Sequence, residues 1–251
     1  MTKKQRVKPV SGCRPNDDAI ERAMFEHPVL SAISREGFAP LGWFAPGIGD
    51  GVPALDDGSE ARFVILIGNA GPAMFRRFAR ERKNGEETLD RWCAGVIGTL
   101  AETLGADAVY PWDEPALPFL TWARRSGVSH SSPLGLNIHA SYGLWHAYRA
   151  ALLFPVAFDL PQSSSKHPCE TCMDKPCLTA CPVHAFTGGG YDLEVCVNHI
   201  ASDRGATCMS GGCLARRACP VGQHFAYEPE QMNFHMLAFR NSRLAARRKT
   251  S

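Results

Sequence analysis

Eight cysteines in the last third of the chain have the spacing of iron–sulfur ligands. They are eight of the ten in the chain, and they lie between residues 169 and 219. A 4Fe–4S cluster is held by four cysteine thiolates. The first run reads C-x2-C-x4-C-x3-C-P, and the second, looser run ends in the Cys-Pro pair Cys219-Pro220. Because such runs in two-cluster ferredoxins give their last cysteine to the other cluster, the pattern predicts two clusters with exchanged terminal ligands.

The exchange divides the eight cysteines into two complete sets of four. The first set is Cys169, Cys172, Cys177 and Cys219. The second set is Cys181, Cys196, Cys208 and Cys213. Two other uses of these thiols stay open: disulfide bonds, which belong to oxidising compartments, and structural zinc, which also takes four-cysteine sites.

The other two cysteines are expected to have no ligand role. Cys13 lies in an N-terminal arm, residues 1–15, far from the cysteine runs. Cys93 lies on the apolar stripe of a predicted helix and is interpreted as a packed core thiol. Arg216 and Arg217 either offset the charge of a thiolate-ligated cluster or form a solvated pair. Three histidines flank the cysteines and are candidates for hydrogen bonds to cluster sulfurs: His184, His199 and His224.

Two further patterns could belong to ligand sites but are interpreted as having no ligand role. His139 and His146 are seven residues apart and would share one face of a helix, as in a haem or mononuclear metal site. Satisfied or solvent-facing histidines are the preferred interpretation. The three glycines at 188–190 follow no strand in a nucleotide-binding pattern, so they predict a turn. The sequence contains no G-x-S-x-G motif, and no catalytic residue is assigned.

Composition limits the class of protein. The chain has 251 residues, of which 45% are hydrophobic and 21% charged, enough for one large domain or two smaller ones. The net charge of +2 gives no case for nucleic acid or an acidic membrane surface. The N-terminus lacks the apolar core of a secretory signal, and no apolar run is long enough to span a bilayer. We therefore expect a cytoplasmic protein with no nucleic-acid partner and no membrane partner.

Hydrophobic periodicity predicts a mixture of helices and strands before the cysteines. The apolar run in residues 61–71 predicts a strand buried on both faces. Residues 84–105 predict the clearest helix, closed by Gly105. The segment from Tyr142 to Pro155 fits strand or helix. The remaining expectations are a helix opening at residue 16 and stopping near residue 37, strands at 41–46 and 106–112, helices from residue 72 and at 118–126, loops at 47–58 and 161–165, and a helix at 228–247.

Two stretches resemble known families. The string IHASYGLWHAYRAALLFP, at 138–155, is similar to a segment of the cobalamin-processing chaperones of the CblC type, and GPAMFRRF, at 71–78, resembles the start of one of their helices. The cysteine region is similar to that of epoxyqueuosine reductase and the reductive dehalogenases. In those proteins a cobalamin domain of nitroreductase-like fold precedes a two-cluster ferredoxin module. Their isolated cysteine corresponds to Cys196, which supports the second ligand set.

The resemblance implies a fold, a cofactor pocket and an activity. Arg149 corresponds to the family arginine that lines the cofactor pocket. Four residues would lie near it: His139, Tyr142, Gly143 and Trp145. The implied fold is α+β, with a nitroreductase-like domain at 16–160, a two-cluster ferredoxin-like module at 166–227, and a C-terminal helix and basic tail at 228–251.

The leading functional hypothesis is an iron–sulfur oxidoreductase. It would take low-potential electrons from an external donor of the ferredoxin or flavodoxin type and pass them through two 4Fe–4S clusters to a bound corrinoid. The reaction would be cobalamin reduction or processing, or a cobalamin-dependent reduction. Two alternatives stay open: a ferredoxin-like electron carrier without corrinoid, and an iron–sulfur flavoprotein. Flavin is the less favoured cofactor.

Overall fold

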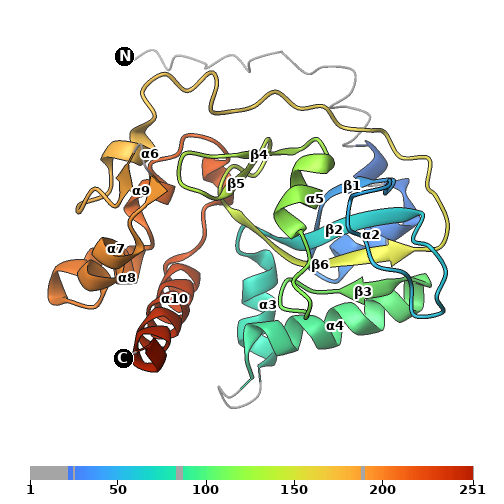
Figure 1. Ribbon diagram of the computed structural model, residues 1–251, viewed down its shortest axis with the longest axis horizontal. Helices are drawn as coiled ribbons and strands as arrows, with labels where there is room; N and C mark the ends of the chain where they lie inside the picture. Colours follow the sequence, from blue (N-terminus) through green and yellow to red (C-terminus); the bar gives the residue numbers. More distant parts are fainter. Residues whose placement is uncertain (1–21, 25, 83–86, 188–189, 251) are drawn as a thin grey trace, which may run out of the picture.

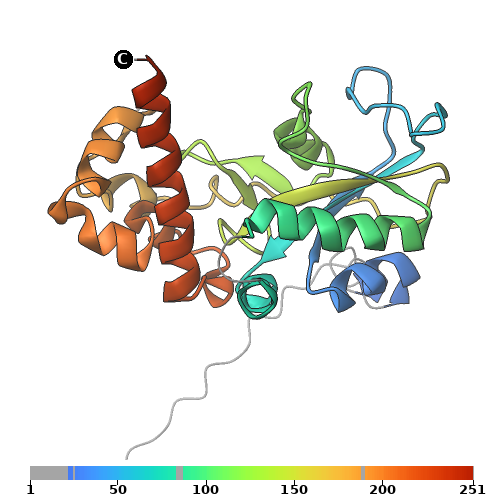
Figure 2. The ribbon, with the colours of Figure 1, turned by 90° about the horizontal axis from the view of Figure 1, so that it is seen from below.

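A sheet with its helices and a smaller helical part that carries the cysteines lie side by side (Figure 1). The computed structural model describes residues 22–24, 26–82, 87–187 and 190–250. The expected helix start at residue 16, Cys13, and two of the three glycines at 188–190 lie outside these ranges. The last helix, α10 (Pro229–Thr250), lies between the two parts (Figure 2).

In the described chain, the main sheet has four antiparallel strands in the order β1-β2-β6-β3. They are β1 (Ala39–Phe44), β2 (Phe63–Ala70), β6 (His146–Phe154) and β3 (Asp107–Val109). β2 is almost wholly buried, as expected, because helices cover both faces of the sheet at this strand. The open question at Tyr142–Pro155 is resolved as strand, since β6 pairs with β2 on one edge and with β3 on the other.

Helices cover both faces of the sheet. They are α2 (Pro28–Arg35), α3 (Ala73–Glu81), α4 (Leu89–Leu104) and α5 (Phe119–Arg125). Alternate residues of β2 point to opposite sides, so Ile65 and Ile67 pack with α2, α3 and α4 while Leu66 packs with Trp122 of α5. Figure 2 shows α2 and α4 on one side of the sheet and α5 on the other. The main hydrophobic core therefore has two layers divided by the sheet.

The predicted helix at residues 84–105 is confirmed with a later start. α4 begins at Leu89, where the hydroxyl of Thr88 accepts a hydrogen bond from the Arg91 amide. Gly105 ends the helix in the left-handed conformation, with φ 64°. Cys93 is fully buried on the inner face of α4, and burial raises the pKa of its thiol to about 12. This supports its interpretation as a core thiol.

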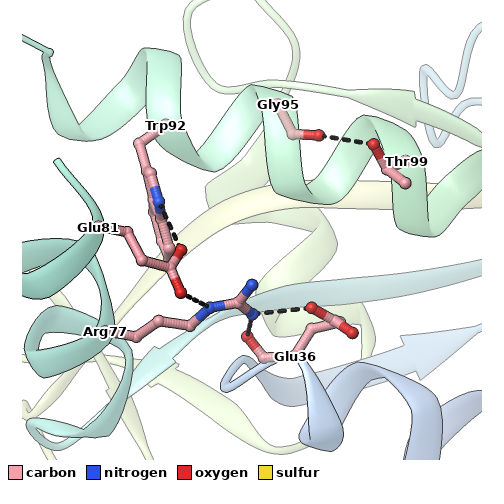
Figure 3. A network of polar contacts seen from close by, with 6 residues as sticks. All are labelled: Glu36, Arg77, Glu81, Trp92, Gly95 and Thr99. Carbon is pink, nitrogen blue, oxygen red and sulfur yellow. Dashed lines mark hydrogen bonds and ion pairs between the residues drawn. The ribbon is translucent and has the colours of Figure 1, made fainter. Parts of the chain in front are cut away.

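One arginine ties three helices together (Figure 3). Arg77 of α3 donates to the main-chain carbonyl and the carboxylate of Glu36, both at 2.7 Å. Its Nε donates to Glu81 at 2.8 Å, and the second carboxylate oxygen of Glu81 accepts from Trp92 Nε1 at 3.2 Å. Because Glu36 follows α2 and Trp92 lies in α4, this network fixes the three helices that cover one face of the sheet.

The cysteine part consists of short elements. They are α6 (Pro176–Thr179), β7 (Phe186–Thr187), β8 (Gly190–Tyr191), α7 (Leu193–Ile200), η1 (Asp203–Gly205), α8 (Ala206–Gly211), α9 (Leu214–Arg217) and η2 (Gln223–Phe225). The expected C-terminal helix is confirmed as α10, which packs on α8 and α7. Its Phe234 also contacts Phe75 and Phe78 of α3, with ring centroids 5.2 and 5.6 Å apart. α10 therefore holds the two parts of the molecule together.

The architecture agrees with the expected α+β class, since an antiparallel sheet and separate helices share one core. Residues 161–165, expected as a linker, are tied to the sheet part instead. Ser165 donates from its amide to the carbonyl of Gly127 at 2.9 Å and from its hydroxyl at 2.8 Å. Of the helices in the described ranges, none has both the length and the apolar character needed to cross a membrane.

Candidate metal centre and adjoining cavities

The thiols of the cysteine part form two groups of mutual neighbours. The pKa of the Cys169 thiol is raised. The largest cause is burial, and the next causes are the nearby thiols Cys219, Cys177 and Cys172. The pKa of Cys177 is also raised, chiefly by burial and then by the nearby thiols Cys219 and Cys172. Cys219 therefore lies with the first cysteine run, although it belongs to the second run in the sequence.

The second group shows the complementary exchange. The pKa of Cys208 is raised by burial and then by Cys213, Cys181 and Cys196. The pKa of Cys213 is raised by burial and, further down, by Cys181, which closes the first run in the sequence. Among the described cysteines, each thiol–thiol interaction that shifts a pKa stays within one of the two groups. The groups coincide with the two predicted ligand sets.

Burial raises the pKa of these thiols, and backbone amides offset part of that effect. Backbone amides donate to several sulfurs: Ala185 N lies 3.4 Å from Cys181 Sγ, and amides of Leu214 and Val221 lower the pKa of Cys208 and Cys219 against the effect of burial. Such N–H donors favour the charged thiolate. An apolar shell adjoins the thiols and includes Leu134, Ile138, Leu144, Ala185 and Ala215. Four of the eight thiols are therefore buried and four are partly exposed, and several accept hydrogen bonds from backbone amides.

The described thiols are reduced and do not converge on a single point. The nine described cysteines are all free thiols. Within the described ranges, no three His, Cys, Asp or Glu side chains converge as a single bound ion requires. In a cubane each thiolate binds a different iron atom, so four thiolates surround the cluster and need not converge on one point. Each of the two groups offers four thiols, the number that a cubane takes.

Tyr191 is a neighbour of the centre that the sequence analysis did not identify. Its hydroxyl hydrogen-bonds to Cys196, which lowers the pKa of that thiol against the larger effect of burial. Its ring stacks on Phe186, with centroids 4.8 Å apart. The short β7–β8 hairpin sets this contact, and no sequence motif indicates it. In the part of the chain that the structure describes, none of the three flanking histidines hydrogen-bonds to a cysteine sulfur: His184, His199 and His224.

Arg216 and Arg217 have different environments. Arg216 Nε donates to the carbonyl of Leu144 at 2.8 Å. Its guanidinium lies 5.0 Å from the ring centroid of Trp145 and 4.5 Å from that of Tyr227. Arg217 is exposed. The expected pair is therefore divided: Arg216 joins α9 to the segment that leads into β6, and Arg217 faces solvent.

The five residues expected to surround a corrinoid do not share one cavity. His139 and Tyr142 line a cavity of about 490 Å³. Trp145 lines a separate hollow beside α9 and α10. Arg149 lines a third cavity, of about 330 Å³, together with Arg216 and His235. Gly143 faces the backbone of the cysteine part. Four of the five residues thus line three separate spaces, and a shared corrinoid pocket stays a prediction.

Arg149 has protein partners on both sides. Its side chain is 13% exposed, its Nε donates to Asn69 Oδ1 at 3.2 Å, and its Nη1 reaches Asp90 at 3.4 Å. Asn69 in turn donates to the hydroxyl of Tyr227 at 2.7 Å. Burial, followed by Arg149 and Arg216, lowers the pKa of His235 to about 3. Two arginines, Arg149 and Arg216, therefore lie near His235 at the interface between the sheet and α10. In these contacts Asp90 is the acidic partner of Arg149.

His139 and His146 lie on strands, so the helical metal site considered from their spacing is not formed. His139 ends β5 (Asn137–His139), which pairs with β4 (Ser129–Ser131), and His146 begins β6. The two rings are 5.6 Å apart and both are buried. Burial lowers the pKa of His146 to about 4, so its imidazole is neutral at physiological pH.

Two glycines bring the cysteine part against the cavity that His139 and Tyr142 line. Gly143 has φ 57°, and a Cβ atom there would lie 2.0 Å from the carbonyl oxygen of Val221. Gly222 has φ 69°, and a Cβ atom there would lie 2.5 Å from the carbonyl of Tyr142. Only glycine permits such an approach at positive φ. The backbone next to Cys219 therefore touches the turn that lines the cavity.

Comparison with known proteins gives likenesses of structure. No family model and no curated protein matches the chain. It is similar to epoxyqueuosine reductase from Streptococcus thermophilus, with a TM-score of 0.49 and 14% identity over 83% of this chain and 70% of that one. It is also similar to a C. elegans B12-trafficking protein CblC, a human MMACHC homologue, with a TM-score of 0.46 and 14% identity over 90% and 96%. A third match is an epoxyqueuosine reductase with a tRNA-Tyr epoxyqueuosine-modified stem loop, with a TM-score of 0.44 and 14% identity over 80% and 69%.

These matches bear on two expectations from the sequence. The matched structures include both kinds of protein that the sequence resembles, so the suspected resemblance is confirmed. Identities of 14% and TM-scores below 0.5 transfer no activity to this chain. The expected absence of a nucleic-acid partner is wrong, because a matched protein has been solved with a tRNA stem loop. A net charge of +2 averages the whole surface and does not exclude such a partner.

Proposed function

We propose that this chain is an iron–sulfur oxidoreductase that passes electrons through two 4Fe–4S clusters to a redox group bound beside them. The observation that supports the proposal is the division of eight thiols into two groups of four. In each group, the cysteine that closes one run lies with the cysteines of the other: Cys219 with the first, Cys181 with the second. An exchange of terminal cysteines is the arrangement known from two-cluster ferredoxins.

The chain's own residues would set the properties of the clusters. When bound, the clusters supply one-electron transfer. Backbone amides such as Ala185 N donate to the thiolates, which offsets their negative charge. Leu134, Ile138 and Leu144 limit access of water to the sulfurs. Hydrogen bonds to sulfur and burial are two of the means by which a protein adjusts cluster potential.

We place the acceptor on the sheet side of the cluster part. The first thiol group is the nearer one, because Val221 and Gly222, which follow Cys219, touch the turn at Tyr142 and Gly143. A corrinoid is the acceptor that the sequence resemblance implies. Four of its five expected residues line three separate spaces, so these residues do not enclose a corrinoid in one cavity. The same proposal includes an external donor of the ferredoxin or flavodoxin type and a cytoplasmic location. It also divides the chain into residues 16–160, 166–227 and 228–251.

Spectroscopy under anaerobic conditions tests the function. The purified full-length chain should show broad visible absorption that dithionite bleaches, and the reduced form should give an electron paramagnetic resonance signal of about two spins per chain. After removal of dithionite, the reduced protein should transfer electrons to added hydroxocobalamin if the acceptor is a corrinoid. Clusters without this transfer would favour a plain electron carrier, and a bound yellow fluorescent cofactor would favour the flavoprotein. A chain without clusters would refute the proposal.

A further inference from the structure

The cavity of about 490 Å³ has the size of a small-molecule site. It lies between β1, the turn after β5, and the segment that returns from β6 to the cysteine part. The described residues that line it are Met24, Pro40, Gly42, Trp43, Ser126, Val128, His139, Ala140, Ser141, Tyr142, Ser163, Ser165 and Phe225. Three aromatic rings and several small residues among them leave room for a flat ligand.

His139 is held in one tautomer by its own turn. Its Nδ1 accepts hydrogen bonds from the amides of Ser141, at 3.1 Å, and Tyr142, at 3.4 Å. Backbone amides can only donate, so Nδ1 carries no proton and the neutral ring carries its proton on Nε2. The residue is 6% exposed, and the hydrogen bonds that its ring makes within the described ranges are the two at Nδ1. Because the Nδ1 edge faces the turn, the Nε2–H group remains as a donor for a ligand.

The ring also stays neutral. Burial first, then the neighbouring His146 and His130, lower the pKa of His139 well below its usual value. A proton on Nδ1 would in addition meet two amide donors. A neutral imidazole that donates a hydrogen bond can polarise a carbonyl group.

The rest of the lining provides no charge. Among the described residues around this cavity there is no Asp, Glu, Lys or Arg. The hydroxyl of Ser126 donates to the carbonyl of Ala123 at 2.7 Å, and Trp43 Nε1 donates to the carbonyl of Pro161 at 3.1 Å. An anionic or cationic group placed here would be desolvated without a partner, which is costly. The buried portion of the ligand must therefore be neutral.

We propose that this cavity binds a neutral, conjugated ring that carries a carbonyl oxygen, and that His139 Nε2–H donates a hydrogen bond to that oxygen. The aromatic side chains Trp43, Tyr142 and Phe225 contact the faces and edges of the ring. His139 is a binding residue and not a metal ligand, since coordination through Nε2 would require loss of its proton. That such a ring acts as the electron acceptor rests on the proposed function, whereas its binding does not require the clusters.

Equilibrium dialysis of the full-length chain tests the binding. Two neutral carbonyl-bearing rings, menadione and riboflavin, distinguish a quinone from a flavin ring, and 2-naphthoate provides an anionic ring of the size of menadione. We expect at least one neutral ring to be retained and 2-naphthoate to be lost. The variant His139→Phe keeps the apolar bulk and removes the donor, and the affinity should fall roughly tenfold. The same change at His235, which lines the other cavity, is the matched control and should leave the affinity unchanged.

Two further measurements keep the proposal open to refutation if His139→Phe does not fold. Ala140→Trp should fill the cavity and abolish binding while His139 stays in place. Nitrogen NMR of the wild-type chain, labelled at histidine, should show one ring protonated at Nε2 alone down to pH 5. Retention of 2-naphthoate as strong as that of menadione, loss of both neutral rings, or an Nδ1–H tautomer at His139, assigned by the signal that His139→Phe removes, would overturn the proposal. His146 donates from its own Nδ1 to Gly143 and is expected to show that tautomer. Iron and sulfide are measured in the same samples, so that failure of the cluster proposal is seen separately.

Discussion

The exchange of terminal cysteines can be tested by combining substitutions. Cys219→Ala removes one ligand from the group that contains Cys172. Each cubane holds about four iron atoms, so loss of one cluster should lower the iron content from about eight to about four per chain. A second substitution in the same group removes nothing more, whereas one in the other group removes the remaining cluster.

The double variants therefore have opposite expected results. Cys219→Ala with Cys172→Ala should keep about four iron atoms, and Cys219→Ala with Cys208→Ala should keep almost none. Iron and sulfide are measured on anaerobically purified proteins, with circular dichroism to confirm that each variant is folded. Cys93→Ala is the matched control, because Cys93 is buried in α4 away from these groups, and it should keep about eight. If instead the pair Cys219 and Cys208 keeps four and the pair Cys219 and Cys172 keeps none, the exchange is wrong.

Three further predictions concern stability. Ile65→Ala at the fully buried centre of β2 should lower the free energy of unfolding by about 3 kcal/mol in urea titration, and a loss below about 1 kcal/mol would contradict the two-layer core. His146 has a folded pKa of about 4, below its unfolded value, so its contribution is present above about pH 6.5 and is lost as the pH falls towards 4. Between pH 7 and 5 the unfolding free energy should therefore drop by about 2 kcal/mol more in the wild type than in His146→Gln; equal drops would show that the histidine is not buried as neutral imidazole. Arg216→Met should cost about 2 kcal/mol through its contacts with Leu144 and two aromatic rings, and the exposed control Arg217→Met less than about 0.5 kcal/mol; similar losses would contradict the difference between them.

Local pattern was sufficient where one physical preference dominates. The continuous apolar run of β2 has no polar face, which only a strand covered on both sides accommodates. The apolar stripe and Gly105 likewise specify most of α4. The spacing of the cysteines gave two sets of four, and the thiols fall into the same two groups in space.

Long-range pairing decided what the sequence left open. The segment that became β6 contains alanine, leucine, arginine and histidine, and its periodicity fits helix as well as strand. Hydrogen bonding to β2 and β3 on both edges makes it a strand. In the folded chain, Trp145 and Arg149 line different cavities from the one that His139 lines.

Side-chain contacts at close range were also beyond the sequence. The tautomer of His139 depends on two amides of its own turn, and the hydroxyl of Tyr191 reaches Cys196 only because β7 and β8 form a hairpin. Arg216 and Arg217 are adjacent in the chain, yet one is held between two rings and the other faces solvent. Such differences come from the packing of α9 against the sheet part and leave no trace in composition.

Metal and sulfide analysis of the full-length chain, purified without oxygen, tests the central claim most directly. Two cubanes predict about eight iron atoms and about eight inorganic sulfides per chain, with no zinc. Zinc in place of iron, or disulfide bonds between the cysteines of residues 169–219, would contradict it.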